Sequence, residues 1–156
     1  MSNNLPAEKQ RKVIAALTDG CSIRATERMT ETHRDTIMRL ARRVGDGCAY
    51  LMDERMRNLP CQNVQIDEIW TFVYKKQRHV KEQDNRSAVG DFWVYVALDA
   101  DSKIVPSYRV GKRDLITTRN FLDDLASRLK NRVQLSSDEL QFYADGVKRS
   151  FGENVD

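Results

Sequence analysis

Apolar residues recur at helical spacing through the first third of the chain. In residues 6–20 the sequence PAEKQRKVIAALTDG predicts a helix that places Val13, Ile14 and Leu17 on one face and ends at Gly20. A second short helix follows over residues 22–29, with Ser22 as its candidate N-cap. These segments predict the start of a small helical core.

A third helix is predicted from residue 32 to residue 45. Thr32 and Asp35 have capping-box spacing, and the apolar stripe repeats every 3.6 residues. This stripe consists of Ile37, Leu40, Ala41 and Val44. A further helix over residues 48–59 is expected to close the core before a linker at Pro60, because proline disfavours helical geometry in the residue before it.

Strand-like alternation begins after Pro60. NVQIDEIWTFVYKK (residues 63–76) predicts a strand with Asp67 and Glu68 on opposite faces, and Glu68 is expected to face water if its side of the sheet is open. Residues 91–105 are apolar on both faces, which predicts a sheet covered on each side. Residues 104–111 predict a third strand, in which Pro106 indicates an edge or a bulge.

A helix, a short strand and a last helix complete the pattern. Residues 117–131 predict an amphipathic helix, residues 132–138 a short strand, and residues 139–152 a helix. The predicted fold class is therefore α/β, with an all-α N-terminal domain at 1–58 followed by β-β-β-α-β-α at 61–156. The inward-facing residues of the two helices are Phe121, Leu122, Leu125 and Leu129, and Leu140, Tyr143, Val147 and Phe151.

Composition narrows the possible partners. The 156 residues contain no apolar run long enough to span a membrane and no secretory leader, so we expect a cytoplasmic protein without membrane contact. Three cysteines and two histidines are too scattered to suggest a disulfide framework or a zinc site. The net charge of +3 lies entirely within residues 1–60, which weakly favours an acidic partner there, such as DNA.

The third predicted helix carries the basic residues of interest. Three short helices with a tight joint before a basic last helix describe a helix-turn-helix, whose last helix enters the major groove of DNA. The candidate DNA-contacting residues are Arg34, Thr36, Arg39, Arg42 and Arg43. A solvated charged face explains the arginines equally well, and His33 fits a packing or capping role better than base recognition.

Two carboxylates in the second part suggest chemistry together. If the first and fourth strands are neighbours, Asp67 and Asp138 converge, and a divalent cation would relieve their repulsion. Asp138 alone is better explained as a helix N-cap, whereas Asp67 has no obvious structural role in so apolar a strand. Asp99 and Asp101 fit a turn, and residues 75–81 fit a solvated basic loop, with DNA contact the weaker alternative.

The segments IDEIWTF, GDFWVYVALDADSKIVPSYRVGKRD and NRVQLSSDELQFYADGVKRSFGENVD resemble DDE transposases of small bacterial insertion sequences. The resemblance runs from about Leu5 to Asp156 and includes a similar linker, MRNLPC. It implies a helix-turn-helix joined to a ribonuclease H-like domain. It further implies that Asp67 and Asp138 are catalytic and bind Mg²⁺ or Mn²⁺ during DNA cleavage and strand transfer.

This resemblance also implies which partners the protein binds, and the sequence departs from the family pattern at two points. DNA, as element ends and target duplex, would be the substrate of a nucleoid-associated homo-oligomer. Glu139 replaces the glycine usual after the second acid, and the third acid of the family, a glutamate on a later helix, has no match. We therefore expect a chain truncated at its C-terminus and inactive alone.

Three functions remain open at this point. The first is a metal-dependent transposase, and the second is a catalytically inactive DNA-binding fragment that occupies element ends or regulates transposition. A ribonuclease H-like nuclease acting on RNA–DNA hybrids is the third and least favoured. Exposed apolar surface on the unfinished side of the sheet predicts poor solubility or association with a second copy.

Overall fold

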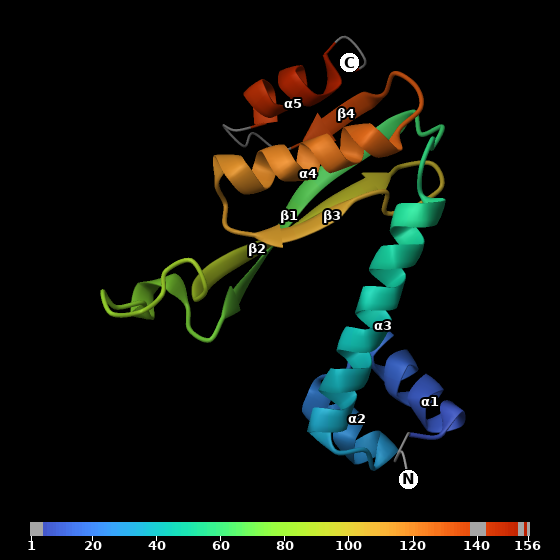
Figure 1. The fold of residues 1–156 in the computed structure, drawn as a ribbon, viewed down its shortest axis with the longest axis vertical. Helices are drawn as coiled ribbons and strands as arrows, with labels where there is room; N and C mark the ends of the chain where they lie inside the picture. The colour runs from blue at the N-terminus through green and yellow to red at the C-terminus, as the bar shows by residue number, and fades with distance from the viewer. Residues whose placement is uncertain (1–4, 138–142, 153–154, 156) are drawn as a thin grey trace. The chain divides into compact units, whose positions relative to one another are not determined.

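The structure is a computed structural model that describes residues 5–137, 143–152 and 155 (Figure 1). The fold class is mixed α/β, as predicted, with helices first and the order β-β-β-α-β-α after them. The chain divides into two compact units, Met1–Glu54 and Arg55–Asp156, and each is described by itself. None of the helices in the described ranges is both long enough and apolar enough to cross a bilayer.

The first unit is built from three helices: α1 (Ala7–Thr18), α2 (Ile23–Thr30) and α3 (Arg34–Arg55). Ser22 caps α2 as predicted, since its side-chain oxygen accepts the N–H of Ala25 at 3.2 Å. Gly20 follows the end of α1 in the left-handed conformation (φ 81°) that favours glycine. The small core contains Val13, Ile37 and Leu40, with Leu5, Ile14, Leu17 and Val44 packed around them.

The start of α3 differs from the predicted capping box. Thr32 is buried and its hydroxyl donates to the carbonyl of Thr30, so it does not cap the helix. The helix begins at Arg34 instead, where Glu27 Oε1 accepts the N–H of Arg34. His33 Nδ1 accepts the N–H of Asp35 at 3.3 Å, so His33 has the capping role considered from the sequence.

The separate fourth helix expected over residues 48–59 is wrong, because α3 continues without a break to Arg55. Gly45 and Gly47 lie inside the helix and adopt ordinary helical geometry, unlike the positive-φ Gly20 that follows α1. Glycine lowers helix stability by about 1 kcal/mol but leaves its backbone N–H and C=O available to the helix. Tyr50 and Leu51 are exposed, so this part of α3 does not close the core.

The second unit contains a four-stranded sheet in the order β3-β2-β1-β4. The strands are β1 (Asn63–Val73), β2 (Gly90–Asp99), β3 (Tyr108–Gly111) and β4 (Gln134–Ser137). β1, β2 and β3 form the predicted antiparallel meander, and β4 pairs with β1 in parallel. The first and fourth strands are therefore neighbours, which was the condition for bringing Asp67 towards the end of β4.

Two helices, α4 (Leu115–Arg128) and α5 (Tyr143–Phe151), lie on the same side of this sheet (Figure 1). Their core residues include Phe121, Leu122 and Leu125 from α4 with Tyr143 and Phe151 from α5. They pack against the sheet residues Val64, Ile66, Tyr95 and Ala97. The close approach of the helices depends on Gly146, where a Cβ would lie 2.5 Å from Leu122 Cδ1.

The prediction of a sheet covered on both faces is wrong for the described residues. Ile69 and Val110 point to the other face and are 59% and 56% exposed, and Tyr108 on the same face is also exposed. Alternation of apolar side chains in β2 reflects one packed face and one partly exposed face, which composition alone cannot distinguish. Pro106 precedes the edge strand β3, in agreement with the predicted edge position.

Asp124 on α4 connects that helix to the segment before β3. Its carboxylate accepts hydrogen bonds from Arg128 Nε at 2.8 Å, Arg128 Nη2 at 2.9 Å and the Ser107 hydroxyl. Partial burial raises the pKa of Asp124, but the hydrogen bonds from Arg128 and Ser107 outweigh it and hold the pKa below its ordinary value. Arg128 is itself buried, so its charge depends on this partner.

We expect Asp124→Asn to lower the free energy of unfolding by about 2 kcal/mol at neutral pH, because a charge-assisted hydrogen-bond pair is lost. The folded-state pKa of Asp124 is lower than the unfolded value near 3.8, so its stabilisation is complete above that pH. It is lost as the pH falls through the folded-state value, and the difference from wild type should shrink there. Urea unfolding across this range measures it, with exposed Glu82→Gln as the control.

Candidate functional site

Asp67 lies in β1 at the point where β1 leaves β4. The parallel register ends with Ile66 opposite Ser137, so the residues that follow in the sequence are Asp67 and Asp138. Asp138 lies outside the described residues, as do Glu139 and Glu153. Asp67 is exposed, and its Oδ1 accepts the backbone N–H of Glu68 at 2.7 Å.

An open hollow of about 340 Å³ surrounds this position. Its volume exceeds that of several water molecules, so a phosphate group or a hydrated ion fits beside Asp67. The lining is rich in oxygen donors suited to a hard divalent cation. We name it the Asp67 hollow, and its lining residues are Gln65, Ile66, Asp67, Ser136 and Ser137.

Glu68, and not Asp67, is the buried carboxylate of β1. The Glu68 side chain is only 2% exposed and points to the helix-covered face. Strand alternation puts neighbouring residues on opposite faces, and the register of β1 with the core residues Val64 and Ile66 decides which face each acid occupies. Glu68 was expected to face water if its side of the sheet was open. That side is covered by helices, so Glu68 does not face water.

Three elements meet at the Glu68 carboxylate. Arg113, in the turn before α4, donates from Nη2 at 3.0 Å and from Nε at 3.2 Å to Glu68 Oε2. The hydroxyl of Tyr143 on α5 donates to Glu68 Oε1. Tyr95 lies opposite Glu68 on β2, and burial, with a further contribution from the Glu68 charge, raises the pKa of Tyr95. Glu68 therefore links β1, the turn and α5.

Sequence reasoning missed this network. Its only signal was the sequence GKRD at residues 111–114, a turn that forms part of the family resemblance and gave no indication of a contact with Glu68. Asp114 in that turn caps α4 by accepting the N–H of Thr117 at 2.7 Å, so the turn position of Arg113 is fixed by the helix start. The partner on α5, Tyr143, is 75 residues away from Glu68 in sequence.

The predicted DNA-contacting residues fall into two groups. Arg34, Arg39 and Arg42 are exposed on α3, and Arg39 Nη2 donates to the hydroxyl of half-buried Thr36 at 3.3 Å. Arg43 donates to Gln10 Oε1 at 3.0 Å, so it joins α3 to α1. Arg34, Arg39 and Arg42 form no ion pair within the part of the chain that the structure describes.

Other sequence-predicted residues have structural roles. Asp99 is buried and accepts the N–H of Ser102 at 2.9 Å, which confirms it as a turn residue. Asp101 accepts from Asn63 Nδ2 at 3.2 Å beside the same turn. Between residues 5 and 137 and in 143–152, no cluster of three His, Cys, Asp or Glu side chains has the geometry of a metal site.

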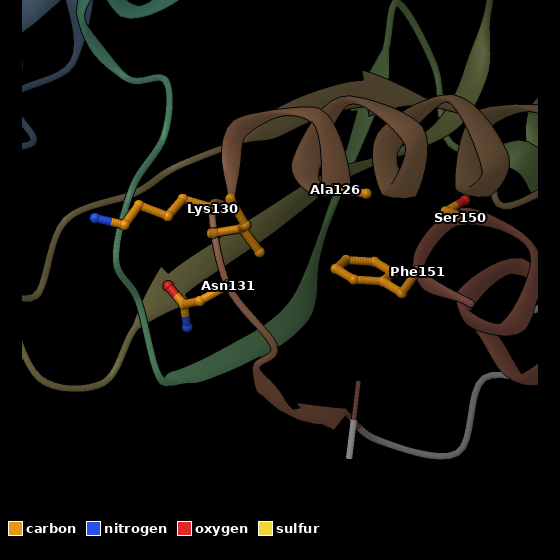
Figure 2. A pocket seen from close by; sticks show the side chains of 6 residues that line it. Ala126, Lys130, Asn131, Ser150 and Phe151 are labelled. Carbon is orange, nitrogen blue, oxygen red and sulfur yellow. The ribbon is translucent and has the colours of Figure 1, made fainter. Parts of the chain in front are cut away.

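A second hollow, of about 120 Å³, lies between the end of α4 and α5 (Figure 2). Figure 2 shows the Phe151 ring from α5 below α4, while Lys130 points away from it. Asn131 Nδ2 donates to the carbonyls of Cys61 and Arg132 at 2.8 and 2.7 Å. Among the described residues, its lining has none in common with the Asp67 hollow and includes no carboxylate, so we regard it as a gap in helix packing.

Comparison with known proteins gave structural similarities alone. No protein-family model matches the chain, and no curated protein sequence matches it. A Mos1 transposase paired-end complex with the left transposon end is similar with TM-score 0.38 and 14% identity over 96% of this chain. The Mos1 mariner paired-end complex with Mn gives the same values, and a pre-cleavage Mos1 transpososome gives 0.40 and 13% over 100%.

The chain spans 59–60% of the length of those Mos1 chains. Their identity and TM-scores are too low to transfer residues or activity to this protein. Any role of Asp67, Glu68 and the α3 arginines is therefore argued only from the geometry described above.

We expect Arg113→Met to lower the free energy of unfolding by about 2 kcal/mol, because it leaves the buried Glu68 charge without its cation. Urea denaturation of the chain at neutral pH measures this loss. The double variant Glu68→Gln/Arg113→Met removes both charges and should recover part of the stability. A double variant that is no more stable than Arg113→Met would show that the ion pair is not what holds the turn to β1.

Proposed function

We propose that this chain is a DNA-binding and DNA strand-processing protein of the DDE transposase type. In this proposal the three-helix unit is a helix-turn-helix, and the second unit is a ribonuclease H-like domain with Asp67 and Asp138 as its first two acids. The observation that supports it most is the parallel pairing of β1 with β4, whose last pair immediately precedes both aspartates in the sequence.

In this proposal, phosphoryl transfer takes place at the Asp67 hollow, and its oxygen-rich lining supports this. Asp67 together with Asp138 would hold Mg²⁺ or Mn²⁺, since adjacent carboxylates repel and these cations prefer oxygen ligands. When bound, such an ion activates an attacking oxygen and stabilises the leaving oxygen at phosphorus. The exposure of Asp67 leaves this carboxylate accessible to a DNA backbone.

The protein scaffold would fix the position of Asp67. Glu68 is held through its side chain by Arg113 and Tyr143, and its N–H donates to Asp67 Oδ1. The peptide between the two acids is therefore fixed on both sides: by the sheet register and by the buried ion pair. Such preorganisation limits the movement of a carboxylate that must meet a phosphate in one geometry.

In the first unit, α3 would lie in the major groove of duplex DNA. Arg34, Arg39 and Arg42 would contact phosphates or bases because their side chains are exposed, and Thr36 is placed beside Arg39. Arg43 would act mainly through the α1–α3 contact made with Gln10. Element ends, a target duplex and a homo-oligomeric assembly belong to this proposal.

The alternative function is DNA binding without catalysis. It is favoured by the same exposed arginines on α3, which need no metal site to bind duplex DNA. This alternative predicts affinity for DNA that is unaffected by substitution of Asp67. Both functions predict duplex binding by the α3 arginines, and the Mn²⁺-binding experiment on Asp67 separates them.

We expect the double variant Arg39→Gln/Arg42→Gln to bind duplex DNA more weakly and with less salt dependence. The slope of log K against log salt is negative, and each lost phosphate contact should reduce its magnitude by about 0.9. Fluorescence anisotropy with a labelled duplex at several salt concentrations measures both quantities. Lys12→Gln on α1 is the control, and unchanged duplex binding in the double variant would remove these arginines from the interface.

We expect Asp67→Asn to weaken Mn²⁺ binding by the chain at least tenfold, because one anionic oxygen ligand is lost. Electron paramagnetic resonance of free Mn²⁺ measures this, and metal-dependent nicking of supercoiled DNA provides a second readout. Asp46→Asn, at an exposed position on α3, is the matched control. Equal Mn²⁺ affinity in wild type and Asp67→Asn, with duplex binding intact, would support the binding-only alternative.

A further inference from the structure

The outer ends of β1 and β2 extend beyond α4 and carry η1 (Gln77–His79) and a loop between them (Figure 1). We name the segment Trp70–Asp91 the aromatic–basic arm. The Asp67 hollow and the α3 helix use none of its residues. All of the arm lies in the described part of the chain.

Three aromatic side chains are exposed along the β1 side of the arm. Trp70 and Phe72 are each 44% exposed, and their ring centroids lie 5.7 Å apart. Tyr74 is 83% exposed and has a positive φ of 66°. Trp70 and Phe72, at alternate positions of β1, form a platform suited to contact with flat apolar surfaces, and Tyr74 adds an exposed ring in the bend that follows β1.

Lysines accompany these rings. Lys76 Nζ lies 5.2 Å from the centre of the Trp70 ring, and Lys75 Nζ lies 5.2 Å from the centre of the Tyr74 ring. Arg78, Lys81 and Arg86 are exposed in the same arm. Cations interleaved with aromatic rings suit a ligand that is both anionic and aromatic.

Two of the acidic side chains of the arm accept hydrogen bonds from other residues of the arm. Asp84 accepts from Lys75 Nζ at 2.9 Å and from the N–H of Lys81 at 2.6 Å, and hydrogen bonding from Lys75 lowers the pKa of Asp84. Asp91 accepts the N–H of Gln77 at 2.8 Å. This backbone hydrogen bond leaves the Asp91 charge uncompensated, as is that of Glu82. With five Lys/Arg against three Asp/Glu, the arm still has a net charge of +2.

Hydrogen bonds at its base attach the arm to the sheet. Gln77 Oε1 accepts the N–H of Asp91 at 3.3 Å, and a Cβ at Gly90 (φ 94°) would lie 2.3 Å from that oxygen. Lys112 Nζ donates to the carbonyls of Val89 and Asp91 and lies 4.0 Å from the centre of the Phe92 ring. A surface ordered before binding loses less conformational entropy when a ligand binds.

We propose that the aromatic–basic arm binds single-stranded DNA, with Trp70, Phe72 and Tyr74 stacking on bases and the cations contacting phosphates. Unpaired bases offer the flat faces that these rings fit, whereas duplex DNA hides them within its stack. The excess of cations favours this polyanion over an apolar protein surface. The inference rests on the proposed function only in having DNA as the common ligand, and it involves none of the α3 residues.

The test is binding of a labelled oligo-thymidine of about 12 nucleotides to the complete chain, followed by anisotropy. Tyr74→Ala should weaken binding about tenfold, as expected for loss of one stacked base. Lys76→Gln/Arg78→Gln should lower the salt slope by about 0.7 for each lost phosphate contact. In a Trp93→Phe background, the remaining Trp70 fluorescence should be quenched by the oligonucleotide.

Controls separate this arm from the proposed duplex-binding helix. Lys130→Gln, an exposed lysine of the same unit, should leave single-strand affinity unchanged, and Arg39→Gln/Arg42→Gln should weaken duplex binding alone. Circular dichroism checks that each variant folds. Single-strand affinity within twofold of wild type in Tyr74→Ala and Lys76→Gln/Arg78→Gln would overturn the proposal. If these variants keep the single-strand affinity of wild type but differ from it in sedimentation coefficient, the arm is a self-association surface instead.

Discussion

The second unit depends on one buried charge. The Glu68 carboxylate is almost inaccessible to water, so it must be neutralised by partners or it would destabilise the sheet strongly. Arg113 and Tyr143 provide those partners from the turn before α4 and from α5. One side chain therefore joins β1, the turn before α4 and α5. Apolar packing alone would stabilise the same elements but would specify their relative positions less sharply.

Much of this fold could be predicted from local sequence. Ser22 and Gly20 mark helix ends through capping chemistry, and the apolar spacing of Phe121, Leu122 and Leu125 identifies the inner face of α4. Pro106 indicated an edge strand because it lacks a backbone donor. These signals work because each depends on residues within one turn or one strand of each other.

Features set by distant contacts could not be predicted in the same way. Which face of β1 is buried depends on its pairing with β2 and on α4, so the sequence placed Asp67 and Glu68 on opposite faces without deciding which of them is buried. Gly45 and Gly47 look like a helix end, yet α3 continues through them. The Glu68–Tyr143 contact joins residues with no local sequence relationship.

The alternation of β1 has a consequence for how this protein tolerates change. The side chains of Asp67 and Glu68 lie on opposite faces of the sheet, so that Glu68 faces the packed interior and Asp67 faces solvent. Substitution of Glu68 therefore disturbs the fold, whereas substitution of the exposed Asp67 carries little penalty in folding. A chain that keeps Glu68 and loses Asp67 would keep its architecture.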